Sequence, residues 1–329
     1  MNTSAPPTSA KKRGLTPADR VITAVALGMI AGLISYFSMR SHPMHLAKDF
    51  SYPWRAARAL VDGHNPYEVI QPVAPYPFNA KLMYPLPAAI VAVPFSFFRP
   101  EHAGGVFIGL SVALLAWVLL RDSPYRLPLV LSAPFVHAII LGQWSPLLTA
   151  AALLPTFQMF AAAKPTVGLA AWLYKPSIRG IVGGVVLVAI AFLVQPGWVS
   201  EWLAAAGSTN KYRGPATTLL GCFLLLGLLR WRRREGRLFV AMSLMPQLPV
   251  FYDSVILWLI PSTVWRSLFL SAVSWIGYVA WLPHQASPNQ NEIAFPWLVF
   301  TMYAPALLLL LMLPPREAEA SKLEKMLGA

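Results

Sequence analysis

The chain has 329 residues, of which 57% are hydrophobic and only 12% are charged, and its mean hydropathy is +0.56. A soluble domain gathers its apolar residues in one core, but here long apolar runs recur from Val21 to Leu313, as is typical of membrane spans. The net charge of +13 does not indicate a nucleic-acid partner, because the cations flank the apolar runs and form no basic stripe interleaved with aromatic residues. The single cysteine, Cys222, excludes an intramolecular disulfide and a thiol-based metal site. The composition therefore predicts an all-α, polytopic transmembrane helical bundle that contacts membrane lipids.

The chain opens with a polar, basic segment, residues 1–20, which is predicted to be a disordered cytoplasmic tail. Val21 to Met39 follows as the first span, and its length and the poor cleavage site at its end argue against a cleaved signal peptide. A first extracytoplasmic loop, residues 40–81, comes next. Further apolar segments lie at about 82–98, 103–120, 126–141, 146–162, 165–174, 180–195, 215–230, 238–251, 254–265, 267–283 and 293–313. Several are shorter than the roughly 20 residues that cross a bilayer core. We therefore expect about 10–12 spans in a transmembrane domain over 21–313, followed by a cytoplasmic tail over 314–329.

The distribution of the 26 Lys and Arg residues predicts the orientation. With the N-terminus inside and twelve spans, sixteen cations fall inside and ten outside, and Arg99 is among the inside residues whereas Arg121 and Arg126 are among the outside ones. The run from Arg230 to Arg237 gives the firmest inside assignment. The expected location is a bacterial-type cytoplasmic (inner) membrane, with a cytoplasmic N-terminus and the loop 40–81 outside.

The first loop is predicted to carry a short interfacial helix. Ser51 can cap it, Pro53 suits its first turn, and Gly63 ends it. The sequence His64 to Tyr67 is turn chemistry, because a residue that precedes proline is pushed out of the α region. Asp49 lies just before this helix, where backbone N–H groups favour an ionised carboxylate that can accept a proton.

Several segments together resemble a known group of enzymes. These segments are Asp49 before a helix with aromatic and Arg residues, Asp62-Gly63-His64-Asn65-Pro66-Tyr67, Met83-Tyr84-Pro85-Leu86-Pro87, Leu141-Gly142-Gln143-Trp144-Ser145, Lys175-Pro176 with Lys164-Pro165 as a second candidate, and Tyr252-Asp253. The pattern resembles the polyprenyl-phosphate-sugar-dependent glycosyltransferases of the GT-C superfamily, and glycosyltransferase family 87 in particular, which includes membrane mannosyltransferases. The chain departs from that pattern at Ser145, where the family usually has Asn, and at Leu86, which separates two prolines. The resemblance covers roughly residues 20 to 265.

The resemblance implies an inverting transfer of a sugar, with mannose favoured by analogy, from a polyprenyl-phosphate donor to a lipid or glycan acceptor on the extracytoplasmic side. Asp49 would be the general base, with Asp253 as the second candidate. The other implied donor-phosphate or substrate-binding residues are Lys48, Arg55, Arg58, Asn65, Tyr67, Lys81, Tyr84, Gln143, Lys175 and Tyr252. No cofactor is implied beyond the lipid-linked donor, and His42, His45 and Asp49 form no recognised ligand set for a metal.

Other readings of these residues remain open. Asp49 can be a helix charge paired with an arginine, and Arg55 and Arg58 can face lipid headgroups. Asp253 can be a helix cap. The polar residues inside apolar runs, His137, Gln143 and Gln158, can join helices by hydrogen bonds or line a pocket. At the level of the whole chain, a transporter or lipid flippase is the rival function, and a non-catalytic GT-C-like assembly subunit is a third.

Overall fold

The structure is a computed structural model that describes residues 15–41, 48–71, 76–77, 81–207 and 212–314. The segments predicted as tails therefore lie mostly outside the described residues, as do His42 and His45. The first helix, α1 (Pro17–Arg40), begins before the predicted boundary at residue 20, because Thr16 and Asp19 form a capping box in which each side chain accepts a hydrogen bond from the backbone N–H of the other.

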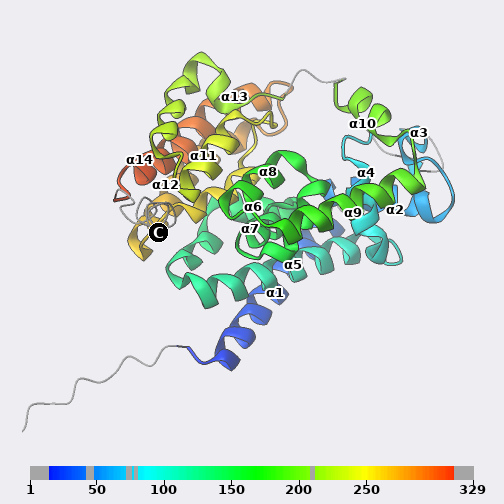
Figure 1. Cartoon of the computed structure of the whole chain (residues 1–329), viewed down its shortest axis with the longest axis horizontal. Helices are drawn as coiled ribbons and strands as arrows, with labels where there is room; N and C mark the ends of the chain where they lie inside the picture. The colour runs from blue at the N-terminus through cyan, green and yellow to red at the C-terminus, as the bar shows by residue number, and fades with distance from the viewer. Residues whose placement is uncertain (1–14, 42–47, 72–75, 78–80, 208–211, 315–329) are drawn as a thin grey trace, which may run out of the picture.

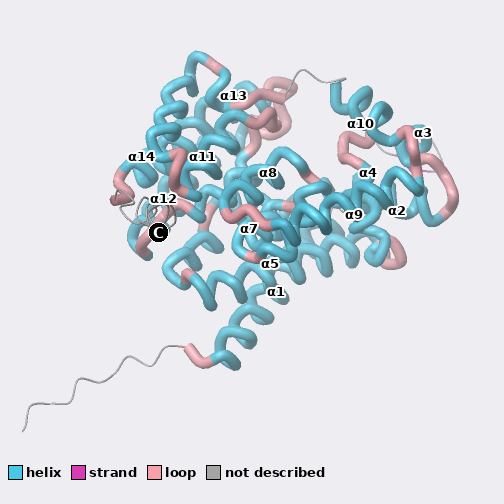
Figure 2. Tube along the Cα trace, in the orientation of Figure 1, coloured by secondary structure: helices cyan, strands magenta, loops and turns pink. Residues whose placement is uncertain are grey.

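The described residues are mostly helical, which confirms the predicted all-α class (Figures 1 and 2). The first half of the chain comprises α1, η1 (Lys48–Phe50), α2 (Ser51–Val61), α3 (Pro66–Val69), α4 (Leu86–Ala92), η2 (Val93–Phe95), α5 (Pro100–Asp122), η3 (Pro124–Leu131), α6 (Ala133–Leu141), α7 (Ser145–Leu153), η4 (Pro155–Ala163) and α8 (Pro165–Tyr174). The second half comprises α9 (Ile178–Val194), α10 (Trp198–Gly207), η5 (Pro215–Thr217), η6 (Leu219–Arg230), α11 (Arg234–Leu244), η7 (Phe251–Leu259), α12 (Val264–Trp281), η8 (Leu282–His284), α13 (Gln290–Leu298), η9 (Val299–Tyr303) and α14 (Ala304–Leu311). Two two-residue strands, β1 (Ile70–Gln71) and β2 (Tyr76–Pro77), pair in parallel.

The helical surface is that of a membrane-embedded protein. Three helical stretches, Pro17–Arg40, Pro100–Asp122 and Gln290–Leu311, are long and apolar enough to cross a membrane, or up to five if each of two bent helix pairs counts as one span. Large apolar side chains also face outward along α1 and α9, and Leu193 is 84% exposed. A soluble protein does not carry apolar faces of this extent, whereas hydrocarbon covers them at no cost.

Glycines allow α1 and α5 to pack closely in antiparallel directions. A Cβ at Gly28 would lie 2.6 Å from the carbonyl oxygen of Gly109, and one at Gly32 would lie 2.8 Å from that of Gly105. Glycine is therefore required for the backbones to approach this closely. The C-terminal end of α1 lies beside the N-terminal end of α5.

This pairing corrects one predicted span. The segment 82–98 forms only a short apolar helix, Leu86–Phe95, and the chain returns to the end of the bundle where α1 finishes. Arg99, which precedes α5, thus lies at the same end of this helix pair as Arg40, although the cation count had put the two on opposite sides. Arg121 lies at the other end of α5.

A second predicted span, 146–162, is a reversal. It consists of two nine-residue helices, α7 and η4, separated at Leu154, which is extended (φ −114°, ψ 99°) because it precedes Pro155. The hydroxyl of Ser145 and the ammonium of Lys164, at the two ends of this helix pair, both bond to Asp253. The chain therefore enters and leaves the α7–η4 helix pair at the same end, beside Asp253.

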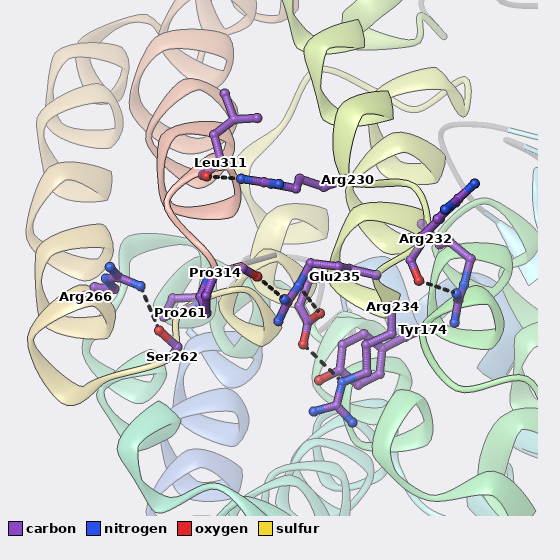
Figure 3. A network of polar contacts seen from close by, with 12 residues as sticks. Tyr174, Arg230, Arg232, Arg234, Glu235, Pro261, Ser262, Arg266, Leu311 and Pro314 are labelled. Atoms are coloured by element: carbon purple, nitrogen blue, oxygen red, sulfur yellow. Dashed lines mark hydrogen bonds and ion pairs between the residues drawn. The ribbon is translucent and has the colours of Figure 1, made fainter. Parts of the chain in front are cut away.

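Arginines gather at the end of the bundle that lies away from Asp253, where many helices begin or end (Figure 3). Arg126 is buried and donates to the carbonyl oxygen of Pro261 (3.2 Å) and to the hydroxyl of Tyr174 (3.0 Å). Arg230 donates to the carbonyl oxygen of Leu311 at 2.7 Å. Guanidinium groups thus satisfy carbonyl groups that the ends of the helices leave without a partner.

The first loop packs over the bundle at the other end, on the side shared with α4, α9 and α10 (Figure 1). Helix α2 ends as predicted, since Gly63 adopts a left-handed conformation (φ 75°). Ser51 does not cap it, because the preceding turn η1 continues directly into the helix. The tryptophan Trp54 donates to the carbonyl oxygen of Phe95 (3.2 Å), which fixes α2 to the short α4–η2 segment.

Candidate functional site

Four polar side chains from distant parts of the chain meet beneath the first loop. Asp49 comes from η1, Gln143 from the turn after α6, Lys164 from the junction of η4 and α8, and Asp253 from η7. Lys164 Nζ donates to Asp253 Oδ1 (2.6 Å) and to Gln143 Oε1 (3.1 Å), and Gln143 Nε2 donates to Asp49 Oδ2. Ser145 Oγ also donates to Asp253 Oδ1 at 3.1 Å. One chain of hydrogen bonds therefore connects the two carboxylates through Gln143 and Lys164.

Local backbone conformations position these side chains. Gly142 ends α6 in the left-handed region (φ 67°, ψ 43°), which turns the chain so that Gln143 can reach Asp49. Lys48 also has a positive φ of 49°, a conformation that is costly for a residue with a side chain. Phe50 is fully buried, with its ring centroid 4.2 Å from that of Phe107, and this packing holds η1 against the bundle.

The electrostatic environment of Asp49 favours a carboxyl group that exchanges protons near neutral pH. The pKa of Asp49 is raised to about 6, because burial and the nearby Asp253 carboxylate, which raise it, outweigh the ammonium group of Lys164, the hydroxyl of Tyr252 and the ammonium group of Lys48, which lower it. A carboxyl with such a pKa is largely ionised at neutral pH yet is basic enough to accept a proton.

Two cavities open beside this cluster. The first, of about 510 Å³, is mainly apolar, and Lys164, Thr166, Tyr84 and Tyr212 are among its lining residues. The second, of about 830 Å³, is more polar and is lined in part by His137, Arg213, Trp281, Gln290 and Glu292. Both cavities are within the size range of ligand pockets. Asp49, Tyr52, Met83, Tyr212, Leu248 and Tyr252 line both.

Two of the predicted substrate-binding residues, Asn65 and Tyr67, form hydrogen bonds that stabilise the loop. Asn65 caps α3, accepting from the backbone N–H of Tyr67 (3.0 Å), and it donates to Glu201 of α10 (3.0 Å). The hydroxyl of Tyr67 donates to the carbonyl oxygen of Tyr84 at 2.9 Å. These bonds join the first loop to α10 and to the segment that carries Tyr84, which itself lines the first cavity.

The cations of the first loop do not line either cavity among the described residues. Lys48 donates to Ser38 Oγ (2.5 Å), Arg58 donates to the carbonyl oxygen of Ser96 (3.5 Å), and Lys81 is exposed. Arg55, one helical turn before Arg58, is partly buried on α2. These four cations therefore form no part of the described cavity walls, although Lys48, next to Asp49 in the chain, is close enough to lower the pKa of that carboxyl.

The Lys-Pro pair at the cluster is Lys164-Pro165, which the sequence had ranked second. Lys175 lies at the far end of the ten-residue helix α8, about 15 Å from its start. Its carbonyl oxygen accepts a hydrogen bond from Gln158 at 2.7 Å, and its side chain is exposed. Gln158 thus joins two segments by a hydrogen bond, one of the two roles left open for it.

Some residues of the cluster and of the cavity walls were not predicted as site residues. Ser145, which donates to Asp253, entered the sequence analysis only as a departure from the family pattern, and His137 takes the pocket-lining role that was one of its two alternatives. Tyr212 carries no local sequence signal, because it is one aromatic residue near the start of an apolar segment. Among the described residues, no group of three or more His, Cys, Asp or Glu side chains is arranged to hold a metal ion. In the comparisons with known proteins, no protein-family model, curated protein or solved structure matches this chain.

Proposed function

We propose that this chain is an integral-membrane inverting glycosyltransferase that moves a sugar from a polyprenyl-phosphate donor to a lipid or glycan acceptor. The observation that carries the proposal is the position of Asp49: a carboxyl group with a pKa of about 6 lies where an apolar cavity meets a more polar one. A lipid-linked donor and a hydroxylated acceptor need environments that differ in this way. They also need a base between them.

In the proposed reaction, Asp49 removes the proton from an acceptor hydroxyl as its oxygen attacks the anomeric carbon of the donor sugar. The bond between that carbon and the phosphate oxygen breaks, and polyprenyl phosphate leaves with the electron pair. Gln143 holds the carboxylate in place by donating to Oδ2. Asp253 is a poorer candidate for the base, because its Oδ1 already accepts from Lys164 and Ser145.

Lys164 is the candidate for the donor phosphate in place of the four loop cations. Its ammonium group has three N–H donors, and Asp253 and Gln143 use two of them. The third is available to a phosphate oxygen in the apolar cavity. The start of α8, which has no side-chain cap, follows directly with Thr166 on the cavity wall, and helix N-termini favour phosphate.

We further propose that the chain is a multi-pass protein of a bacterial-type inner membrane, with the site on the extracytoplasmic side. Its crossings would be α1, α5, η3–α6, α8, α9, η6, α11, η7, α12 and α13–α14, with α7 and η4 as a re-entrant pair. In this arrangement Arg99 leaves the cytoplasmic set of cations, and Arg121 and Arg126 join it. The excess of cations on the cytoplasmic side grows as a result, which supports the orientation.

A transfer assay tests the proposal. Membranes that contain the chain are supplied with a radiolabelled polyprenyl-phosphate mannose, and labelled acceptor is measured. We expect transfer that depends on the chain and disappears when Lys164 is replaced by Gln. Movement of labelled lipid between leaflets without release of the sugar would instead identify a flippase and would rule out the transferase.

A further inference from the structure

His137 is a buried polar side chain with an unpartnered ring nitrogen. The residue is 5% exposed, and within the described part of the chain its Nδ1 atom has no hydrogen-bond partner. Placing an imidazole in an apolar environment without partners is costly. Other buried polar atoms, among them Trp144 Nε1, Gln158 Oε1 and Ser267 Oγ, also have no partner, but these residues line neither cavity beside Asp49. His137 combines an unpartnered buried nitrogen with a place on a cavity wall, and this combination needs an explanation.

The surroundings of His137 are aromatic and come from two other elements. From its ring centroid, those of Tyr278, Tyr252, Trp281 and Phe251 lie 5.1, 5.5, 5.5 and 6.4 Å away. His137 belongs to α6, whereas these four residues belong to η7 and α12. The rings form a wall of π faces and edges around the imidazole.

This wall borders the more polar cavity. His137, Tyr252 and Trp281 line the cavity of about 830 Å³, together with Asp49. On its exposed side, Arg213 and Glu292 form a two-contact ion pair at 2.8 and 3.2 Å. The cavity thus combines aromatic faces, one unpartnered imidazole and a charged margin, and it leads to the carboxylate of Asp49.

We infer that this cavity is the acceptor site, that the acceptor presents a pyranose ring there, and that His137 selects it by hydrogen bonding to a ring hydroxyl. A pyranose has an apolar face of C–H groups, which packs on aromatic rings, and a rim of hydroxyls, which needs a few well-placed polar partners. Assigning this cavity to the acceptor rests on the proposed function, because only a transfer reaction has both an acceptor and a donor.

The opposite assignment, with the lipid of the donor in this cavity, fits less well. A polyprenyl chain would leave the imidazole unpartnered and would lie against Arg213 and Glu292, whereas the first cavity offers it apolar walls beside Lys164. An inverting displacement also requires the acceptor to approach the anomeric carbon from the side opposite the phosphate. Two cavities that meet at Asp49 provide these two directions.

Binding of a simple saccharide tests the inference without relying on turnover. The full chain in lipid nanodiscs is titrated with methyl α-D-mannopyranoside, and saturation-transfer NMR measures binding, with empty nanodiscs as the blank. We expect wild-type binding at or below about 10 mM, about tenfold weaker binding for His137→Phe, and a smaller loss for His137→Asn, which keeps a hydrogen-bonding group. The matched control is His102→Phe, because the His102 side chain is 50% exposed and lines neither cavity beside Asp49.

A thermal unfolding measurement separates recognition from a structural role. His137→Phe replaces a ring that lacks partners with an apolar ring of similar shape, so the unfolding temperature without saccharide is expected to stay the same or rise. If the Phe variant does not fold, the Asn variant decides: weaker binding supports the inference, and unchanged binding overturns it.

The inference and the proposed function can fail separately. No binding by the wild-type chain up to about 10 mM, or wild-type affinity in the Phe variant, overturns the acceptor-site inference even if sugar transfer occurs. If the chain transfers no sugar but binds the saccharide in a way that depends on His137, the pyranose site is supported and the proposed reaction is ruled out.

Discussion

Replacing Asp49 by Asn tests the proposed general base most directly. Asn keeps the size of the side chain and can still accept the hydrogen bond from Gln143, but it cannot take a proton. General-base catalysis contributes about 10²-fold or more, which corresponds to about 2.7 kcal/mol of activation free energy. We therefore expect transfer to fall at least about 100-fold while donor binding persists.

The same substitution should change stability in a pH-dependent way. Burial raises the pKa of Asp49 from an ordinary 3.8 to about 6 in the folded chain, a difference of about 3 kcal/mol. Between those two values the unfolded chain loses its proton first, so wild-type stability falls as pH rises and stays reduced above about 6. The Asn variant does not titrate. It should be more stable than wild type at pH 8, by up to about 3 kcal/mol, and the difference should vanish below pH 4.

The assay measures transfer, donor binding and thermal unfolding in nanodiscs at pH values from 4 to 8. Wild-type kcat/KM is expected to rise with an apparent pKa of about 6, because only the ionised carboxylate is a base. Asp62→Asn is the matched control, since Asp62 lies in the same loop at the surface and pairs with Arg58 at 3.9 Å. Full activity of the Asp49 variant would refute the reasoning, and an inactive Asp253→Asn beside it would move the base to Asp253.

Two further pairs of substitutions have matched controls within the chain. Lys164→Gln should abolish transfer and destabilise the fold by about 3–5 kcal/mol, because it leaves the buried Asp253 carboxylate unpaired, whereas Lys175→Gln should change stability by less than about 0.5 kcal/mol. Equal effects on transfer would show that the Lys164 cluster has no special role. Gly32→Ala should cost about 1–3 kcal/mol, because the new methyl group would lie 2.8 Å from a backbone oxygen of the facing helix. Gly184→Ala, whose methyl group would meet its nearest atom at 3.9 Å, should be neutral or stabilising by roughly 0.5–1 kcal/mol, and thermal unfolding measures both.

Hydropathy predicted the helical class and most helix positions but not where the chain reverses. The run 146–162 is apolar throughout, so a hydropathy window counts it as one span, although Leu154 before Pro155 breaks it into two short helices. The run 82–98 fails for a related reason, because the direction of the following helix, α5, depends on its packing against α1 and not on apolarity. Apolarity reports burial or lipid contact. It does not report direction.

The site was predicted best where a backbone feature accompanies the side chain. Gln143 follows a glycine that must be left-handed, and Asp49 precedes a helix start, so both left a local signal. The loop cations were chosen because they are near Asp49 in sequence, yet α2 directs Arg58 toward Ser96. The two Lys-Pro pairs look alike in sequence, and only the ten-residue length of α8 separates Lys164 from Lys175.

The arginines at the end of the bundle opposite Asp49 have a consequence for the order of assembly. In the proposed orientation, the cluster that includes Arg230 retains its loop in the cytoplasm as the chain is inserted, before α14 has been synthesised. The carbonyl group of Leu311 that Arg230 later binds does not yet exist at that time, since it lies 81 residues further along the chain. The same guanidinium therefore acts first as a signal for topology and afterwards as a hydrogen-bond donor that holds the end of the last helix, α14. A lysine at this position would preserve the first role and weaken the second, so errors in orientation and errors in closure should be separable by mutation.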